Sequence, residues 1–116
     1  MELLDELRNI GVDVDEGIER LMGNTSLYER MLFKFADMMK NISVSPDFDD
    51  SNYSEITEAA HAVKGSAGNL SITPIYEAYT EIVSLLRAGR TEQAKEIIKG
   101  IQPVQADIIA CIERYM

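Results

Sequence analysis

Apolar residues recur every three or four positions along most of the chain, which is the spacing that puts them on one face of an α-helix. No stretch shows the convincing alternation of apolar and polar residues that marks a β-strand. The pattern predicts two short helices and then four long ones, at about residues 3–10, 16–22, 25–42, 52–70, 73–88 and 91–116. The sequence therefore predicts an all-α protein.

Cap and turn residues support several of these boundaries. Asp13 or Asp15 can cap the second helix, because a side-chain oxygen there can accept a hydrogen bond from a free backbone N–H group. Ser51 or Asn52 can do the same for the fourth helix. Thr73-Pro74 combines a cap residue with a first-turn proline, which predicts the start of the fifth helix.

Two segments interrupt the helical pattern. Residues 43–50 hold Pro46 and three aspartates and are predicted to form a loop. Gly100 and Pro103 fall inside the last helix, and we expect a kink or short break there because proline removes a backbone hydrogen bond. The prediction is a single domain over residues 1–116, folded as an antiparallel up-down four-helix bundle with short N-terminal helices.

Charge and composition narrow the classes of function. The chain has 20 acidic and 11 basic residues and a net charge of −9, which argues against binding to nucleic acid or to an anionic membrane. No apolar run reaches the length of about 18 residues that a membrane span needs, and the acidic N-terminus does not resemble a signal peptide. Cys111, the one cysteine, is expected to be buried and fits a reducing, cytoplasmic location.

The one histidine, His61, is predicted to face outward. With Val63 at the centre of the apolar face and about 100° per residue, His61 falls at about 160°, on the opposite side. The apolar face that would be buried with Val63 is formed by Ile56, Ala59, Ala60, Ala67 and Leu70.

Lys64, Gly65 and Gly68 follow His61 at the third, fourth and seventh positions and share its helix face. Each glycine lowers helix stability by about 1 kcal/mol relative to alanine. Two of them beside an exposed imidazole indicate a surface that a partner approaches closely. An idle surface histidine, a solvated lysine and glycines that serve helix packing stay open as alternatives.

The ten residues from His61 to Leu70, HAVKGSAGNL, resemble the signature of histidine-containing phosphotransfer (HPt) domains, which is close to H-x-x-K-G-S-A-G-N-L-G. Residues 11–35 and 85–89 are similar to the segments that precede and follow this signature in the family. Val63 stands where the family usually has leucine, and Ser71 where it often has glycine. Neither difference is at a position expected to take part in the reaction.

The resemblance implies a phosphorelay intermediate. His61 would accept a phosphoryl group from the aspartyl phosphate of one receiver domain and pass it to an aspartate of another. Lys64 would stabilise the charge of the phosphoryl group. Gly65 and Gly68 would leave clearance for the receiver.

The docking surface is expected around His61 and to include Thr57 and Glu58. The N-terminal helices are further candidates for part of it, with one or two partly exposed residues among Ile10, Val12, Ile18, Leu21 and Met22. Ser66 and Asn69 are expected to be structural, Ser66 through a hydrogen bond to a backbone carbonyl and Asn69 at the helix end.

The implied partners are response-regulator receiver domains, a hybrid histidine kinase or both, with Mg²⁺ bound by the receiver. Because the chain has no G-x-x-x-x-G-K-[ST] loop for a nucleotide, we expect no cofactor and no kinase activity of its own. We also expect a monomer. Met1, close to the first predicted helix, favours a free-standing protein.

Other functions have less support in the sequence. The main alternative is a helical adaptor that docks receiver domains without phosphotransfer. The presence of both His61 and Lys64 argues against this alternative. A metal site is not expected, because His61 and Cys111 match no zinc spacing and residues 45–50 lack the full calcium-loop pattern.

Overall fold

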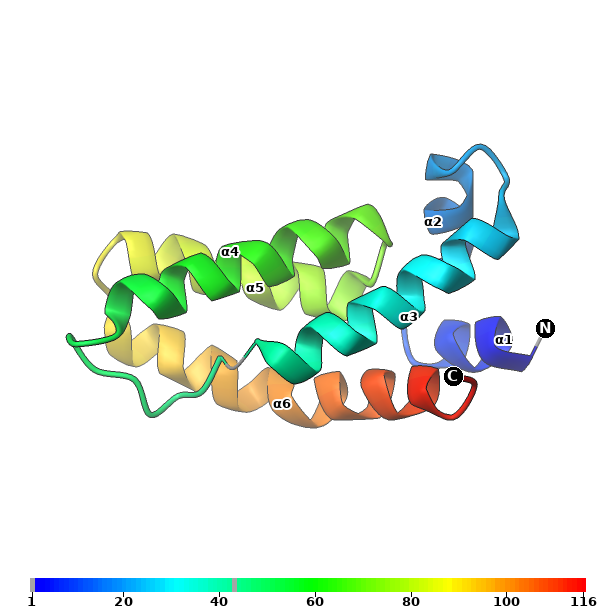
Figure 1. Cartoon of the computed structure of the whole chain (residues 1–116). Coiled ribbons are helices and arrows are strands. Elements are labelled where there is room, and N and C mark those ends of the chain that lie inside the picture. The colour runs from blue at the N-terminus through cyan, green and yellow to red at the C-terminus, as the bar shows by residue number, and fades with distance from the viewer. Residues whose placement is uncertain (1, 43) are drawn as a thin grey trace.

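The structure is a computed structural model that describes residues 2–42 and 44–116, and these residues form helices and no strand. The all-α prediction is confirmed. In chain order the helices are α1 Glu2–Asn9, α2 Val14–Arg20, α3 Thr25–Asn41, α4 Tyr53–Asn69, α5 Thr73–Arg87 and α6 Thr91–Glu113 (Figure 1).

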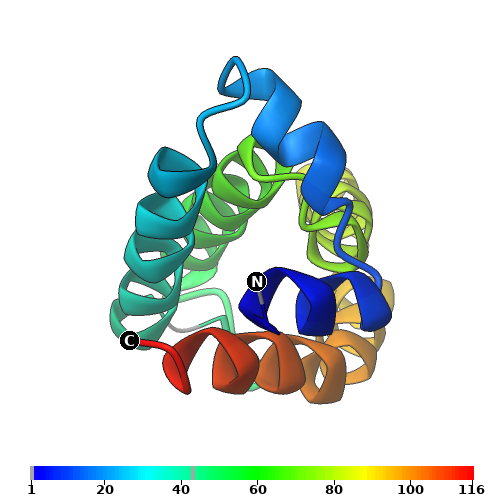
Figure 2. The same ribbon diagram turned by 90° about the vertical axis from the view of Figure 1, so that its right-hand side faces the viewer.

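The four long helices α3 to α6 run along the length of the molecule (Figure 1). Helices α4 and α5 form one antiparallel hairpin and α5 and α6 a second, because short turns join helices that pack along each other. Helix α3 lies against α6 and contacts α4 more narrowly. The short helices lie at one end of the molecule (Figure 2). There α1 packs on α6, and α2 lies above α1 and contacts both α1 and α3.

The packing of α4 fixes which of its residues face the solvent. Val63, the predicted centre of the apolar face, is fully buried. The other buried side chains of this stripe are Ile56, Ala60, Ala67 and Leu70, while Ala59 is half-buried. Burying such a stripe stabilises the fold by about 25 cal/mol per Å² of apolar surface, so the rotation of α4 about its axis is strongly determined. His61, on the opposite side, is exposed as predicted.

Helix boundaries agree with the sequence analysis to within a few residues. Asp13 caps α2 by accepting a hydrogen bond from the Glu16 N–H at 3.1 Å. Helix α2 begins and ends two residues earlier than predicted, at Val14 and Arg20. Asn52 is the N-cap of α4, but its side-chain oxygen accepts from the backbone N–H of Asp49 rather than from the helix.

Thr73 is not the cap of α5, contrary to the prediction. Ile72 occupies that position, and the Thr73 hydroxyl donates to the Ser71 carbonyl at 3.3 Å. Pro74 lies in the first turn of α5 as expected.

Helix α6 runs without a break through Gly100 and Pro103, so of the predicted kink or short break, the break is wrong. Both residues are exposed. The carbonyl that Pro103 leaves without a helical partner therefore faces water, which can satisfy it.

The described part of the predicted 43–50 loop is non-helical, and Ser43 lies outside the described residues. Phe48 anchors the loop: it is buried, packs edge-on against the Tyr53 ring at 5.9 Å, and has the Lys95 ammonium 5.0 Å from its centroid.

Candidate functional site

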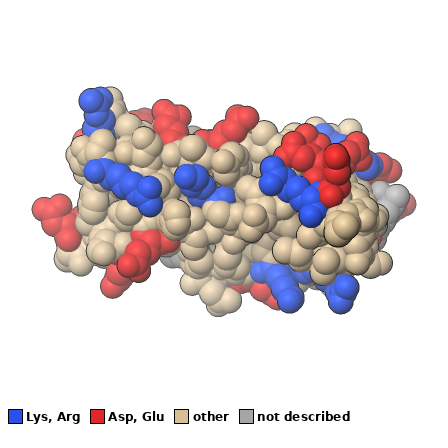
Figure 3. Space-filling view, turned by 90° about the horizontal axis from the view of Figure 1, so that it is seen from above, with Lys and Arg blue, Asp and Glu red and all other residues tan. Residues whose placement is uncertain are grey.

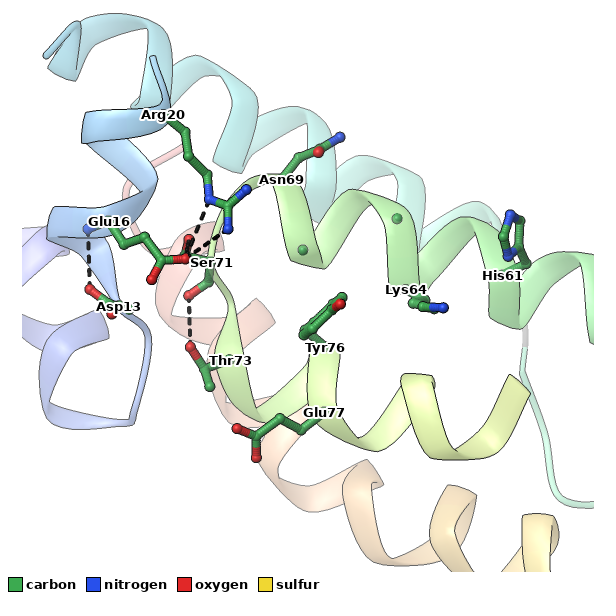
Figure 4. Close-up of a pocket in the computed structure, with 12 residues that line it drawn as sticks. Asp13, Glu16, Arg20, His61, Lys64, Asn69, Ser71, Thr73, Tyr76 and Glu77 are labelled. Carbon is green, nitrogen blue, oxygen red and sulfur yellow. Dashed lines mark hydrogen bonds and ion pairs between the residues drawn. The ribbon is translucent and has the colours of Figure 1, made fainter. Parts of the chain in front are cut away.

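His61 projects from the outer face of α4 beside a groove between α4, α5 and α2 (Figure 4). The groove has a volume of about 520 Å³. Helix α4 contributes residues from His61 to Asn69, α5 contributes Tyr76 and Glu77, and α2 contributes Glu16 and Arg20. Exposed on a rigid helix, the imidazole is accessible to a partner.

Lys64 lies one helical turn after His61 and lines the same groove. Its side chain is half-buried, so its aliphatic part rests on the protein while the ammonium reaches the groove. Within the described residues no carboxylate forms an ion pair with it. Its charge is therefore available to an anionic group placed next to His61.

Gly65 and Gly68 differ in what surrounds them. A Cβ atom built on Gly65 would meet no atom within 4 Å, so nothing in the described structure requires glycine there. A Cβ atom on Gly68 would lie 2.8 Å from Cε1 of Tyr76, because the Tyr76 ring covers that position. Packing against α5 thus accounts for Gly68, the alternative that the sequence left open, whereas only Gly65 leaves free space beside His61.

The other predicted docking residues lie outside the groove. The Thr57 hydroxyl donates to the Tyr53 carbonyl one turn earlier at 2.9 Å, and the side chain is half-buried. Glu58 is exposed one turn before His61. The structure therefore gathers His61, Lys64, Gly65 and Gly68 in one groove and does not add Thr57 or Glu58 to it.

Ser66 and Asn69 flank the core face of α4. The predicted bond from Ser66 to a backbone carbonyl is wrong, because its hydroxyl instead lies 3.4 Å from the Met38 sulfur across the α3–α4 contact. Asn69 is exposed at the last residue of α4. Of the N-terminal apolar residues, Met22 is 96% exposed and Val12 is buried. The remaining three, Ile10, Ile18 and Leu21, are half-buried, so four of the five residues are at least partly exposed rather than the one or two predicted.

Sequence reasoning missed a polar network at the end of the groove (Figure 4). The Ser71 hydroxyl donates to Oε1 of Glu16 at 2.9 Å. Arg20 donates to the same oxygen through Nε at 3.3 Å and Nη2 at 2.9 Å. The pKa of the Glu16 carboxyl is lowered first by Arg20 and then by Ser71, which keeps Glu16 ionised. The one sequence signal was Ser71, in the place of a family glycine.

Buried contacts hold α2 and α3 against the turn between α4 and α5. The Tyr28 hydroxyl donates to the Leu70 carbonyl at 2.8 Å, and burial raises the pKa of that hydroxyl. Gly17 packs against both groups with no room for a side chain. The backbone N–H of Asp13 also donates to the Ser71 carbonyl at 2.9 Å. Helix α2 is thus fixed as one wall of the groove.

Charged side chains are unevenly spread on the face above α4, α5 and α2 (Figure 3). Its middle shows mainly uncharged and basic side chains, and acidic ones gather along its edges and toward α2. The chain as a whole is strongly acidic, with a net charge of −9. This face is therefore better suited to an anionic partner group than the overall charge implies.

Other kinds of site find little support in the described residues. No cluster of three or more His, Cys, Asp or Glu side chains is arranged to bind a metal ion there. Cys111 is buried as predicted, and burial raises the pKa of its thiol. No helix in the described ranges combines the length and the apolar character that crossing a membrane requires.

Comparisons with known proteins show the family of the chain. The family model described as the Hpt domain matches residues 2–114. Comparisons with curated proteins and with solved structures gave no match. Domains of this family transfer phosphoryl groups without being kinases, and they interact with receiver domains and histidine kinases. Since the match spans nearly the whole sequence, the chain belongs to the Hpt domain family, which carries out histidine phosphotransfer in two-component signalling.

Proposed function

We propose that this chain is a phosphorelay intermediate in which His61 takes a phosphoryl group from one receiver domain and gives it to another. The observation that carries the proposal is the exposed imidazole with empty space at Gly65, one helical turn away. A glycine inside a helix lowers stability, and no internal contact explains this one. Clearance for a docked partner would explain why residue 65 is glycine. We take α3 to α6 as the up-down four-helix scaffold that presents this site.

The reaction needs only an accessible nucleophile and a positioned charge. The lone pair of a neutral imidazole nitrogen attacks phosphorus, the N–P bond forms, and the bond from phosphorus to the aspartyl oxygen breaks to release carboxylate. The second transfer reverses these steps with a different aspartate. We infer that Nε2 is the acceptor, because it is the ring nitrogen farther from the α4 backbone; a ³¹P NMR spectrum that places the phosphate on Nδ1 would contradict this.

We propose that the receiver domain supplies the metal ion for the reaction. In the proposed reaction Mg²⁺ is held by carboxylates of the receiver domain, where it neutralises charge on the transferred group. Lys64 adds one cation from the Hpt side. We further propose that the chain works as a monomer in the cytoplasm, in keeping with its single buried thiol.

Replacing Lys64 with alanine is expected to slow phosphoryl transfer to His61 by about tenfold at saturating receiver, since one charge-assisted contact is worth about 1.5 kcal/mol. The measurement is single-turnover transfer from a phosphorylated receiver. Lys99→Ala, which removes an exposed lysine from α6, serves as the matched control. An unchanged rate in the Lys64 variant would remove this residue from the mechanism.

A larger side chain at residue 65 is expected to leave the fold stable while it slows phosphoryl transfer. Gly65→Ala should raise the free energy of unfolding by about 0.5–1 kcal/mol, because alanine favours the helix and meets no neighbour. Gly65→Leu should still fold yet lower the transfer rate at least about tenfold, since the added side chain holds the receiver away from His61.

Gly100 provides the control for this pair, because it also has open space around it but lies on α6. Gly100→Leu should leave transfer unchanged. Chemical denaturation and single-turnover transfer measure the two effects. A Gly65→Leu variant that transfers at the wild-type rate would refute the role of this space.

A further inference from the structure

Ser71 has a backbone conformation that its residue type rarely adopts. Its φ is +54°, in the left-handed region that favours glycine, and the residue is buried in the turn between α4 and α5. Glycine would relieve this strain. Residues held in such conformations at functional sites are maintained by their surroundings, so the Ser71 side chain calls for a role.

The role of the Ser71 hydroxyl is visible in its contacts. It donates to Oε1 of Glu16 on α2, and the same oxygen accepts two hydrogen bonds from Arg20. The turn after α4 therefore orients a carboxylate, which in turn orients a guanidinium (Figure 4). Within the described residues Nη1 of Arg20 makes no hydrogen bond, and the side chain is 53% exposed. Arg20 is held in place and still has donors to offer.

Arg20 lies in the groove of His61 but near its opposite end, beside the C-terminus of α4. His61 and Asn69 are eight positions apart on α4, which corresponds to about 12 Å along the helix axis. A phosphoryl group bonded to His61 is therefore out of reach of Arg20, whereas Lys64 is one turn away. This separation excludes Arg20 from the transfer step.

We propose that Arg20 is a specificity-determining residue that binds a carboxylate on the surface of the docked receiver domain, and that Ser71 and Glu16 position it. The planar guanidinium presents paired donors that match a carboxylate, and its pairing with Glu16 leaves some of them free. Receivers with an acidic residue at the matching distance from their phosphorylated aspartate would be preferred. The inference rests on the proposed phosphotransfer function, because that function places a receiver in this groove.

The test measures docking separately from chemistry. In a His61→Gln background, calorimetric titration gives Kd values for a panel of isolated receiver domains at low and high salt. Arg20→Ala is expected to raise Kd by about tenfold for the receivers that bind the parent most tightly, and to reduce the salt dependence of binding. Arg20→Lys should restore binding only in part. Arg87→Ala, which removes an exposed arginine at the far end of α5, is the control and should leave Kd unchanged.

Ser71→Gly distinguishes positioning from folding. It removes the hydroxyl and relieves the strained backbone, so stability should hold or increase while Kd rises about threefold through the misplaced guanidinium. In an Arg20→Ala background, Ser71→Gly should add no further loss, since the two residues act through one contact.

The outcomes separate this inference from the proposed function. Wild-type labelling at His61 together with an unchanged Kd for Arg20→Ala overturns the inference and leaves phosphotransfer standing. A tenfold loss of docking without any labelling at His61 supports Arg20 and overturns phosphotransfer. If no receiver binds the chain at all, both are overturned.

Discussion

Replacing His61 with glutamine is expected to abolish phosphoryl acceptance from any receiver domain. Glutamine has no ring nitrogen that can act as a nucleophile, so no N–P bond can form. Because His61 is exposed and faces away from the core, the substitution should change the free energy of unfolding by no more than about 0.5 kcal/mol. The measurement is label transfer from a radiolabelled phosphorylated receiver, followed on a gel.

The control for this experiment is docking. The His61→Gln variant should bind the unphosphorylated receiver with nearly the wild-type Kd, since Lys64, Gly65 and the α2 wall of the groove are unchanged. Undiminished labelling of the variant would mean that another residue accepts the phosphoryl group.

Replacing Gly17 with alanine is expected to have the largest effect on stability. The new Cβ would lie 2.4 Å from Cε1 of Tyr28 and 2.8 Å from the Leu70 carbonyl oxygen. Neither can move away easily, because Tyr28 is fully buried and its hydroxyl donates to that same carbonyl. We expect the free energy of unfolding to fall by about 2–3 kcal/mol, as overpacking does elsewhere.

Gly100→Ala is the matched control for Gly17→Ala. Gly100 is in a helix with open space around it, so alanine there should stabilise the fold by up to about 1 kcal/mol. Urea denaturation compares the two variants. Equal stabilities for Gly17→Ala and the wild type would show that α2 does not pack on Tyr28 as described, and would also weaken the placement of Arg20.

Much of the fold could be predicted because helical periodicity is a local property. The rotation of α4 followed from the apolar stripe around Val63, and that rotation alone put His61 on the outside. Asp13 as the cap of α2 was likewise a local signal.

What could not be predicted depends on contacts between separate elements. Gly65 and Gly68 look alike in the sequence, and only the Tyr76 ring from α5 distinguishes them. Arg20 joins the groove through Glu16 and Ser71, which are 55 positions apart and meet only when α2 folds onto the α4–α5 turn.

Two local rules about helix ends and interruptions gave wrong predictions. Proline was expected to kink or briefly break the last helix, yet α6 continues without a break, with Pro103 on its exposed side. Thr73 has the chemistry of a cap, but its hydroxyl bonds to the preceding turn and Ile72 takes the cap position.

The most direct test of the account is to find where the phosphate goes. The wild-type chain is incubated briefly with a phosphorylated receiver domain and examined by ³¹P NMR at alkaline pH and by mass spectrometry of its peptides. The account predicts an acid-labile phosphoramidate on the peptide that contains His61. A chain that binds the receiver but stays unlabelled would be an adaptor, and that result, or phosphate on any other residue, would contradict the account.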